Sequence, residues 1–241
     1  MKYILIIGAK NILAKEIAKV YAMNGYNIYL CGRKINEIEQ FAKILQSEYK
    51  IITELRELDI EKFDTHQSFY SSLDPKPFGF INVTGFYPDQ KNAEKSQDDV
   101  SKSININYSG PVSLLNIVAN DLEIRREGFI VGISSVSGER GRMKNYIYGS
   151  AKSAFTTYLS GLRNRLSKSN THVLTVIPGY INTNKNIERP KLLTARPADV
   201  AKDIFNAQKS NKNIIYTKWV WRYIMLVIRI IPEFIFKKLN I

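Results

Sequence analysis

The chain has 241 residues, of which 44% are hydrophobic and 24% charged, and this composition is that of a globular protein and excludes a disordered one. Its 35 basic and 22 acidic side chains leave a net charge of +13, which favours anionic partners such as nucleotide phosphates, anionic lipids or an acidic substrate. Cys31 is the only cysteine, which excludes an intrachain disulfide and a cysteine metal cluster and fits a cytoplasmic location.

Short apolar runs alternate along the chain with longer segments of helical periodicity. The predicted strands are Tyr3–Ile7, Asn27–Leu30, Ile51–Leu58, Phe78–Val83, Gly128–Ser134, His172–Ile177 and Asn213–Tyr216. The predicted helices lie near Ile12–Met23, Ile35–Glu48, Asn105–Leu122, Tyr146–Leu166 and Ala198–Gln208. The first strand is too short for the apolar region of a signal peptide.

This alternation predicts an α/β fold, a Rossmann-type doubly wound parallel sheet with helices on both faces. We expect about seven strands, in the order 3-2-1-4-5-6-7. No internal repeat or low-complexity linker is apparent, so residues 1–217 are expected to form one domain, followed by an amphipathic helical tail over residues 218–241.

The turn after the first strand has features of a nucleotide-phosphate site. Gly8 follows the strand directly and a helix begins soon after, so backbone N–H groups and a helix N-terminus can face a pyrophosphate. At the later glycine positions of such a motif, Ala14 is still small, whereas the branched side chain of Ile12 could obstruct the phosphates. Taken alone, the pattern fits a tight turn without a ligand equally well.

Residues after the next strands support a dinucleotide. Asp59 follows the third strand, where a carboxylate can accept a hydrogen bond from the adenine amino group. The segment Asn82–Gly85 ends the fourth strand. Arg33 follows the second strand near the expected ribose, where an arginine can accommodate a 2′-phosphate, and Lys10 adds to that positive field. We therefore expect NADP(H) in preference to NAD(H), although Arg33 and Lys34 could simply begin a solvated helix.

The strongest signal combines Ser135 with the run Tyr148-Gly149-Ser150-Ala151-Lys152. Tyr148 and Lys152 are four residues apart and project from one face of a helix, while Ser135 follows a strand at the carboxyl edge of the sheet. An ammonium at about 4 Å contributes roughly 4 kcal/mol toward a phenolate, or about three pKa units, so Lys152 is predicted to bring Tyr148 near neutral pH. Ser135 is expected to stabilise a developing alkoxide. A lone Tyr-x-x-x-Lys is more often an ordinary amphipathic helix.

Together these motifs resemble the classical short-chain dehydrogenase/reductase family over about residues 2–216. The resemblance rests on Ser134–Gly138, the Tyr-x-x-x-Lys run, Asn107 at the fourth catalytic position, Pro178-Gly179 and Thr183. It implies reduction of a ketone to a secondary alcohol with a nicotinamide cofactor. In this reading Asn107 holds a water linking Lys152 to solvent, and Thr183 with the backbone after Gly179 fixes the carboxamide.

The expected catalytic residues are Asn107, Ser135, Tyr148 and Lys152. The expected cofactor-binding residues are Gly8, Lys10, Asn11, Ile12, Arg33, Asp59, Asn82, Gly85, Tyr148, Lys152, Pro178, Gly179, Ile181 and Thr183. His66 and His172 are isolated, so no metal site is expected, and no recognised nucleic-acid motif stands out.

A basic loop precedes Tyr148. This loop must pass near the substrate entrance, and its three cations, Arg140, Arg142 and Lys144, could hold a substrate phosphate. The alternative is that all three side chains are merely solvated.

The tail begins with an apolar stretch that is shorter than the roughly 20 residues needed to span a bilayer. Arg222 and Arg229 interrupt it, and its aromatic and basic residues suit a helix lying in the headgroup region, which Pro232 would break or kink. The alternative is an oligomer-contact or core-capping helix, and a homo-oligomer is expected.

With Gly141-Arg142 and Gly161–Leu166, the tail resembles the decaprenylphosphoryl 2-keto-pentose reductase branch of the family. That branch implies a keto-sugar on a polyprenyl phosphate in cell-envelope glycan synthesis, reduced at the inner face of the membrane. A ketoacyl or small-carbonyl reductase is the second enzymatic reading. The non-enzymatic reading is a nucleotide sensor or membrane-associated module.

Overall fold

A sheet of seven parallel strands organises the computed structural model, which describes residues 1–183 and 190–239. Its order, β3-β2-β1-β4-β5-β6-β9, confirms the predicted α/β class and strand order, because β9 is the seventh strand of this sheet. The strands are β1 (Tyr3–Ile7), β2 (Asn27–Gly32), β3 (Thr53–Glu57), β4 (Gly79–Asn82), β5 (Phe129–Ile133), β6 (His172–Pro178) and β9 (Ile214–Thr217). Two further short strands, β7 (Tyr180–Ile181) and β8 (Thr194–Ala195), form a separate parallel pair.

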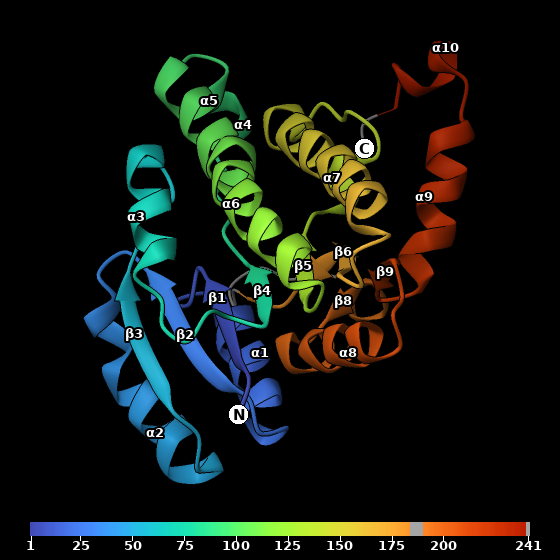
Figure 1. Ribbon diagram of the computed structural model, residues 1–241. Helices are drawn as coiled ribbons and strands as arrows, with labels where there is room; N and C mark the ends of the chain where they lie inside the picture. The colour runs from blue at the N-terminus through green and yellow to red at the C-terminus, as the bar shows by residue number, and fades with distance from the viewer. Residues whose placement is uncertain (184–189, 240–241) are drawn as a thin grey trace.

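Helices cover both faces of the sheet (Figure 1). On one face lie α1 (Ile12–Met23), α2 (Glu39–Tyr49) and α8 (Pro197–Lys209). On the other lie α3 (His66–Ser71), α6 (Gly110–Arg125) and α7 (Tyr146–Leu166). Residues of β1 alternate between the two layers, with Ile4 and Ile6 in the first and Leu5 and Ile7 in the second. Burial on both sides explains why this strand is a continuous apolar run.

The helix predicted near Asn105–Leu122 is longer than the pattern indicated. Helix α5 (Gln97–Ile104), a π-helical turn (Asn105–Ser109) and α6 follow one another without a break. The Ser96 side chain accepts a hydrogen bond from the Asp99 N–H and caps α5, whose polar sequence hides its periodicity. Helices α3 and α4 (Gln90–Ala93) were not predicted, because six and four residues are too few to show a helical period.

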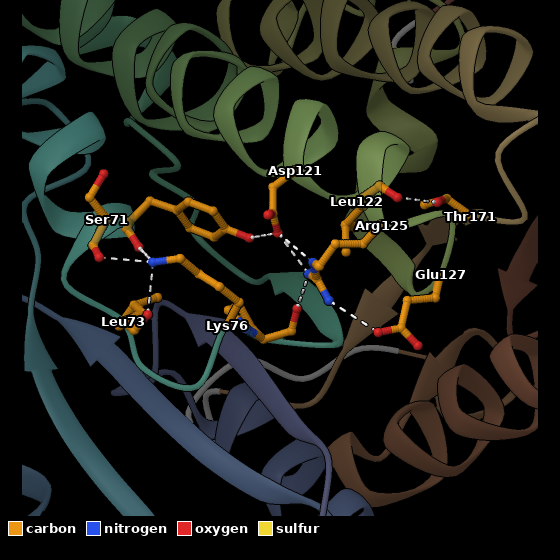
Figure 2. Close-up of polar contacts among 10 residues, drawn as sticks. Ser71, Leu73, Lys76, Asp121, Leu122, Arg125, Glu127 and Thr171 are labelled. Atoms are coloured by element: carbon orange, nitrogen blue, oxygen red, sulfur yellow. Dashed lines mark hydrogen bonds and ion pairs between the residues drawn. The ribbon is translucent and has the colours of Figure 1, made fainter.

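A polar network fixes the loop that leads into β4 (Figure 2). Lys76 Nζ donates to three carbonyl oxygens at the end of α3, at 2.8 to 3.0 Å. Asp121 of α6 accepts from the Tyr70 hydroxyl at 2.7 Å and pairs with Arg125. Arg125 also donates to the Pro77 carbonyl at 2.7 Å, so helices α3 and α6 hold the start of a central strand in place.

The tail folds back onto the sheet edge as α9 (Val220–Ile230) and α10 (Glu233–Phe236). Trp221 and Met225 of α9 pack with Val136 and Ile177 in a small third core. Pro232 separates the two helices, as the sequence predicted. Within residues 1–183 and 190–239, no helix combines the length and the apolarity that crossing a membrane requires.

Strand order reverses between β1 and β4. From β1 the chain proceeds to β2 and β3 on one side of the sheet, and it then returns to add β4, β5, β6 and β9 on the other. The loops after β1 and β4 therefore diverge at the carboxyl edge of the sheet, where open α/β folds bind their ligands.

Candidate active site

Two adjoining cavities lie along the carboxyl edge of the sheet. The first, called here the nucleotide cavity, has a volume of about 300 Å³ and includes Gly8 and Arg33 in its lining. The second, called here the catalytic cavity, has a volume of about 400 Å³ and contains Tyr148. Asn11 and Gly85 line both, so the two cavities form one groove at the β1–β4 switch point.

Gly8 and Asn11 shape the groove where α1 begins. Gly8 has a φ of +83°, and a Cβ there would lie 3.0 Å from both the Thr84 nitrogen and the Val83 carbonyl carbon, so only glycine fits. Asn11 Oδ1 caps α1 by accepting from the Leu13 N–H at 2.9 Å. The first turn of α1 has no acidic side chain to oppose an anion. These residues fit the pyrophosphate of a dinucleotide.

The two basic residues predicted to bind the cofactor line the nucleotide cavity. Arg33 Nη1 lies 3.5 Å from the Glu61 carboxylate, and Lys10 Nζ lies 2.6 Å from that of Glu37. Both cations line the cavity, and each has a carboxylate partner at the surface.

Three predicted cofactor residues do not line either cavity. Ile12 is 45% exposed at the first position of α1, so its side chain does not block the groove as the sequence suggested it could. Asp59 Oδ1 accepts from the Glu61 N–H at 3.1 Å. Asn82 Oδ1 accepts from the Thr84 hydroxyl at 2.8 Å and so shapes the loop after β4. Adenine recognition by Asp59 stays a prediction.

Helix α7 and the end of β5 bring the predicted catalytic groups together. Ser135, Tyr148 and Lys152 all line the catalytic cavity. Lys152 is 2% exposed, donates from Nζ to the Ile133 carbonyl at 3.0 Å, and lies 5.8 Å from the centroid of the Tyr148 ring. Ser135 Oγ accepts from the Ser137 N–H at 3.1 Å and is hydrogen-bonded to Tyr148.

Burial governs the protonation of both groups. It raises the pKa of Tyr148 to about 12, an effect that the Ser135 hydrogen bond partly opposes and the Tyr87 phenol reinforces. It lowers the pKa of Lys152 to about 8. The predicted shift of Tyr148 toward neutral pH is therefore not found, since desolvation outweighs any attraction from the ammonium.

Asn107 lies fully buried in the π-helical turn. Its Nδ2 donates to the carbonyls of Phe86 at 2.7 Å and Ser103 at 2.9 Å, and its Oδ1 accepts from the Phe86 N–H at 3.2 Å. The side chain thus fixes the segment after β4. A water held by Asn107 for Lys152 stays a prediction.

The loop after β6 lines the other side of the catalytic cavity with Pro178, Gly179, Ile181 and Thr183. A Cβ on Gly179 would fall 1.9 Å from the Trp221 indole nitrogen, so α9 packs directly on this loop. Trp221 also lines the cavity and donates to the Leu193 carbonyl at 2.9 Å. Sequence reasoning missed Trp221, because its pattern belongs equally to a surface-binding helix.

Two arginines of the basic loop have different surroundings. Arg140 donates to the carbonyls of Ile228, Arg229 and Ile231 at 2.6 to 3.1 Å, and it pairs with Glu233 at 2.8 Å. It therefore caps the end of α9 and is not available to a substrate, which corrects that part of the basic-loop prediction. Arg142 does line the catalytic cavity.

The two histidines are held by other parts of the fold. His66 Nδ1 lies 3.0 Å from the Ser113 hydroxyl, and His172 Nε2 lies 2.9 Å from the Lys212 carbonyl. In the described ranges, no three His, Cys, Asp or Glu side chains gather as metal ligands would.

Comparison with known proteins agrees with this geometry. Residues 2–192 match the family model of the short chain dehydrogenases. An uncharacterized oxidoreductase of Mycobacterium tuberculosis is 27% identical over 240 residues, covering 98% of this chain and 96% of its own length.

Solved structures show the same fold. A short-chain dehydrogenase from Sphingobium yanoikuyae in complex with NADPH superposes with a TM-score of 0.84 at 18% identity, covering 97% of each chain. A 3-oxoacyl-[acyl-carrier protein] reductase from Brucella melitensis with bound NAD superposes with a TM-score of 0.79 at 18% identity, covering 89% of this chain and 88% of that one.

Proposed function

The chain belongs to the short chain dehydrogenase family and is an NAD(P)-dependent oxidoreductase, and from this premise we propose that it reduces a ketone to a secondary alcohol with Tyr148 as the proton donor. The observation that carries the proposal is the presence of Ser135, Tyr148 and Lys152 in one cavity with the loop after β6. A sensor of nucleotides would not need these three side chains together.

Tyr148 carries a proton at neutral pH and can act as the donor when a positive charge on Lys152 stabilises the resulting phenolate. With its pKa raised to about 12, the phenol is fully protonated at neutral pH. Gly179 and Thr183 of the loop after β6 would hold a nicotinamide, which would supply a hydride to the carbonyl carbon, while the Tyr148 hydroxyl would give its proton to the carbonyl oxygen. Ser135, hydrogen-bonded to Tyr148, stabilises the negative charge that develops on that oxygen.

Lys152 supports the phenol once the proton has left. Its Nζ is held by the Ile133 carbonyl within 5.8 Å of the Tyr148 ring centroid, so a positive charge there favours the phenolate. The amine is buried, and its attraction for the phenolate is therefore little screened by solvent.

For the cofactor, Arg33 and Lys10 support NADP(H) over NAD(H). Both cations line the nucleotide cavity. The Glu57 carboxylate accepts hydrogen bonds from the backbone N–H groups of Lys34 and Ile35, at 2.8 and 3.0 Å. Because both of its oxygens are used in this way, Glu57 is not available to bind a ribose hydroxyl. A 2′-phosphate would compete with Glu61 for the Arg33 guanidinium.

For the substrate, we favour a ketone carried on a polyprenyl phosphate at a membrane surface. In this proposal residues 1–217 form the catalytic domain, and the tail of residues 218–241 contacts the membrane. Support comes from the net charge of +13 and from an apolar outer face on α9 beside the catalytic cavity. Ketoacyl thioesters and small ketones are the competing substrates.

The proposal is tested with Tyr148→Phe, which removes the proton donor and keeps the ring. NADPH oxidation is followed against polyprenyl-phosphate keto-sugars, acyl thioesters and small ketones. Loss of the general acid should lower kcat by about 10²- to 10⁴-fold, with NADPH affinity unchanged. Tyr146→Phe, on the exposed first turn of the same helix, is the matched control and should retain activity.

Turnover by Tyr148→Phe at the wild-type rate would refute the assignment. Activity confined to thioesters would remove the lipid-linked substrate, and tighter binding of NADH than of NADPH would remove the cofactor preference.

A further inference from the structure

Arg142 is half-buried and lines the catalytic cavity. Its Nε and Nη2 atoms are buried and have no hydrogen-bond partner among the described residues. Burial lowers the pKa of the guanidinium, while Tyr180, Tyr87 and Glu139 act in the opposite direction. An arginine nevertheless keeps its charge at neutral pH, so the cavity contains a positive charge with two unpartnered donor nitrogens.

Buried charges in folded proteins are normally paired, because removing them from water without a partner is costly. Arg140, two positions earlier, shows such pairing, with three carbonyls and a carboxylate around its guanidinium. Glu139 accepts from the Tyr216 hydroxyl through Oε1, and its buried Oε2 has no hydrogen-bond partner in the described part of the chain, so neither carboxylate oxygen is bonded to Arg142. No protein group within the described ranges therefore takes up the two Arg142 nitrogens.

The loop around Arg142 is held in place by its own hydrogen bonds. The Asn145 N–H donates to the Arg142 carbonyl at 3.0 Å, and the Gly149 N–H donates to the Asn145 carbonyl at 2.8 Å. Asn145 Nδ2 donates to the Ser137 hydroxyl at 3.1 Å, which leaves its buried Oδ1 without a partner in the same cavity. The part of the catalytic cavity wall that contains Arg142 and Asn145 is thus polar and preorganised.

We propose that Arg142 binds an oxyanion of the ketone substrate, a carboxylate or a phosphate ester, and so makes this enzyme selective for anionic ketones. The inference rests on the proposed reductase function and adds the substrate class to it. A guanidinium is matched to either anion, because both present two oxygens to its planar fork.

The test compares ketones that differ only in the anion: dihydroxyacetone phosphate with dihydroxyacetone, and acetoacetate with its methyl ester. In Arg142→Met, KM for the preferred anionic ketone should rise at least about tenfold, while KM for its neutral partner and the NADPH affinity stay within about twofold. Arg142→Lys should restore part of the loss. Lys168→Met, which removes an exposed cation from the turn after α7, controls for net charge.

Binding is measured separately from turnover. In a Tyr148→Phe/Trp219→Phe background, which leaves Trp221 as the remaining tryptophan, quenching of the fluorescence by dihydroxyacetone phosphate should depend on Arg142. If no ketone is reduced by the wild type, the reductase proposal fails while this measurement still tests Arg142. Equal losses for the charged and neutral ketones, or an unchanged KM and unchanged quenching in Arg142→Met, would overturn the inference.

Discussion

At the catalytic centre, one environment shifts two pKa values in opposite directions. Burial favours the uncharged form of every group, so it raises the pKa of the Tyr148 phenol and lowers that of the Lys152 ammonium. The phenol therefore holds its proton more firmly, whereas the amine gives up its proton in the range where enzymes are assayed. Activity at alkaline pH should be limited by the lysine.

We expect kcat/KM for NADPH, which reports groups of the free enzyme, to fall above a pH of about 8, the pKa of Lys152. Between about 8 and the ordinary value of 10.5, the unfolded chain binds this proton and the folded protein does not. The lysine therefore makes the fold more stable as pH rises through that window, while activity declines. Melting temperatures in the same buffers separate the two effects. A rate profile that is flat to about pH 10 would contradict the role of the ammonium.

The sequence predicts which catalytic residues meet but not how they are protonated. Four-residue spacing places Tyr148 and Lys152 on one helix face, and a strand end delivers Ser135 to them. The Ile133 carbonyl that holds Lys152 Nζ comes from a separate strand, and burial depends on the packing of the whole sheet. Arg140 and Arg142 look alike in sequence, and only the position of α9 distinguishes their roles.

At the scale of elements, α9 and the loop after β6 depend on each other. Trp221 and Met225 are almost fully buried, and the indole lies where any side chain on Gly179 would extend. Arg140 ties the loop before α7 to the end of the same helix. The tail is therefore a wall of the catalytic cavity as well as the terminal segment of the chain.

Gly179→Ala should displace α9. Its methyl group would lie 1.9 Å from the Trp221 indole nitrogen, and overpacking of this kind costs about 1–3 kcal/mol. We expect a lower free energy of unfolding, faster trypsin cleavage within the tail and a red-shifted tryptophan emission. Gly161→Ala in α7 is the control, since a Cβ there meets nothing within 4 Å and alanine favours the helix. Equal stability and equal trypsin resistance in both variants would show that α9 does not depend on Gly179.

The elements themselves were predictable to different degrees. Alternating periodicities predict the seven strands and their order, because handedness and burial leave few ways to join parallel strands. The extent of α5 was missed since its polar face resembles a loop. The docking of α9 could not be read from its residues, because an apolar face has the same pattern whether it meets a core or a membrane.

At the scale of the whole molecule, the outer side of α9 brings exposed apolar side chains and cations together. Its inner side is used by the core, yet Trp219, Tyr223, Leu226 and Ile230 remain exposed. The first three of these line a groove together with Arg222, Arg229 and Lys212, so apolar and cationic side chains lie side by side. Such a surface suits the boundary between acyl chains and anionic headgroups, and the net charge of +13 would draw it there.

Vesicle flotation can test this surface without disturbing the fold. Deleting the tail would remove Trp221 from the catalytic cavity, so charge substitutions on the outer side are the cleaner change. We expect the wild type to float with phosphatidylglycerol vesicles, less so at high salt, and the double variant Leu226→Glu/Ile230→Glu to stay in solution. Ile44→Glu/Ile124→Glu makes the same charge change at exposed positions of α2 and α6 and should float normally.

The opposite result is equally informative. If the wild type does not float and the outer-side variant instead has a smaller mass by light scattering, the exposed side of α9 joins two copies of the chain. An anionic ketone would then have to reach Arg142 from solution, and the lipid-linked substrate would lose its structural support. Binding to vesicles in the wild type and its loss in this variant alone would place the catalytic cavity beside the membrane, because Trp221 on the inner side of the same helix lines that cavity.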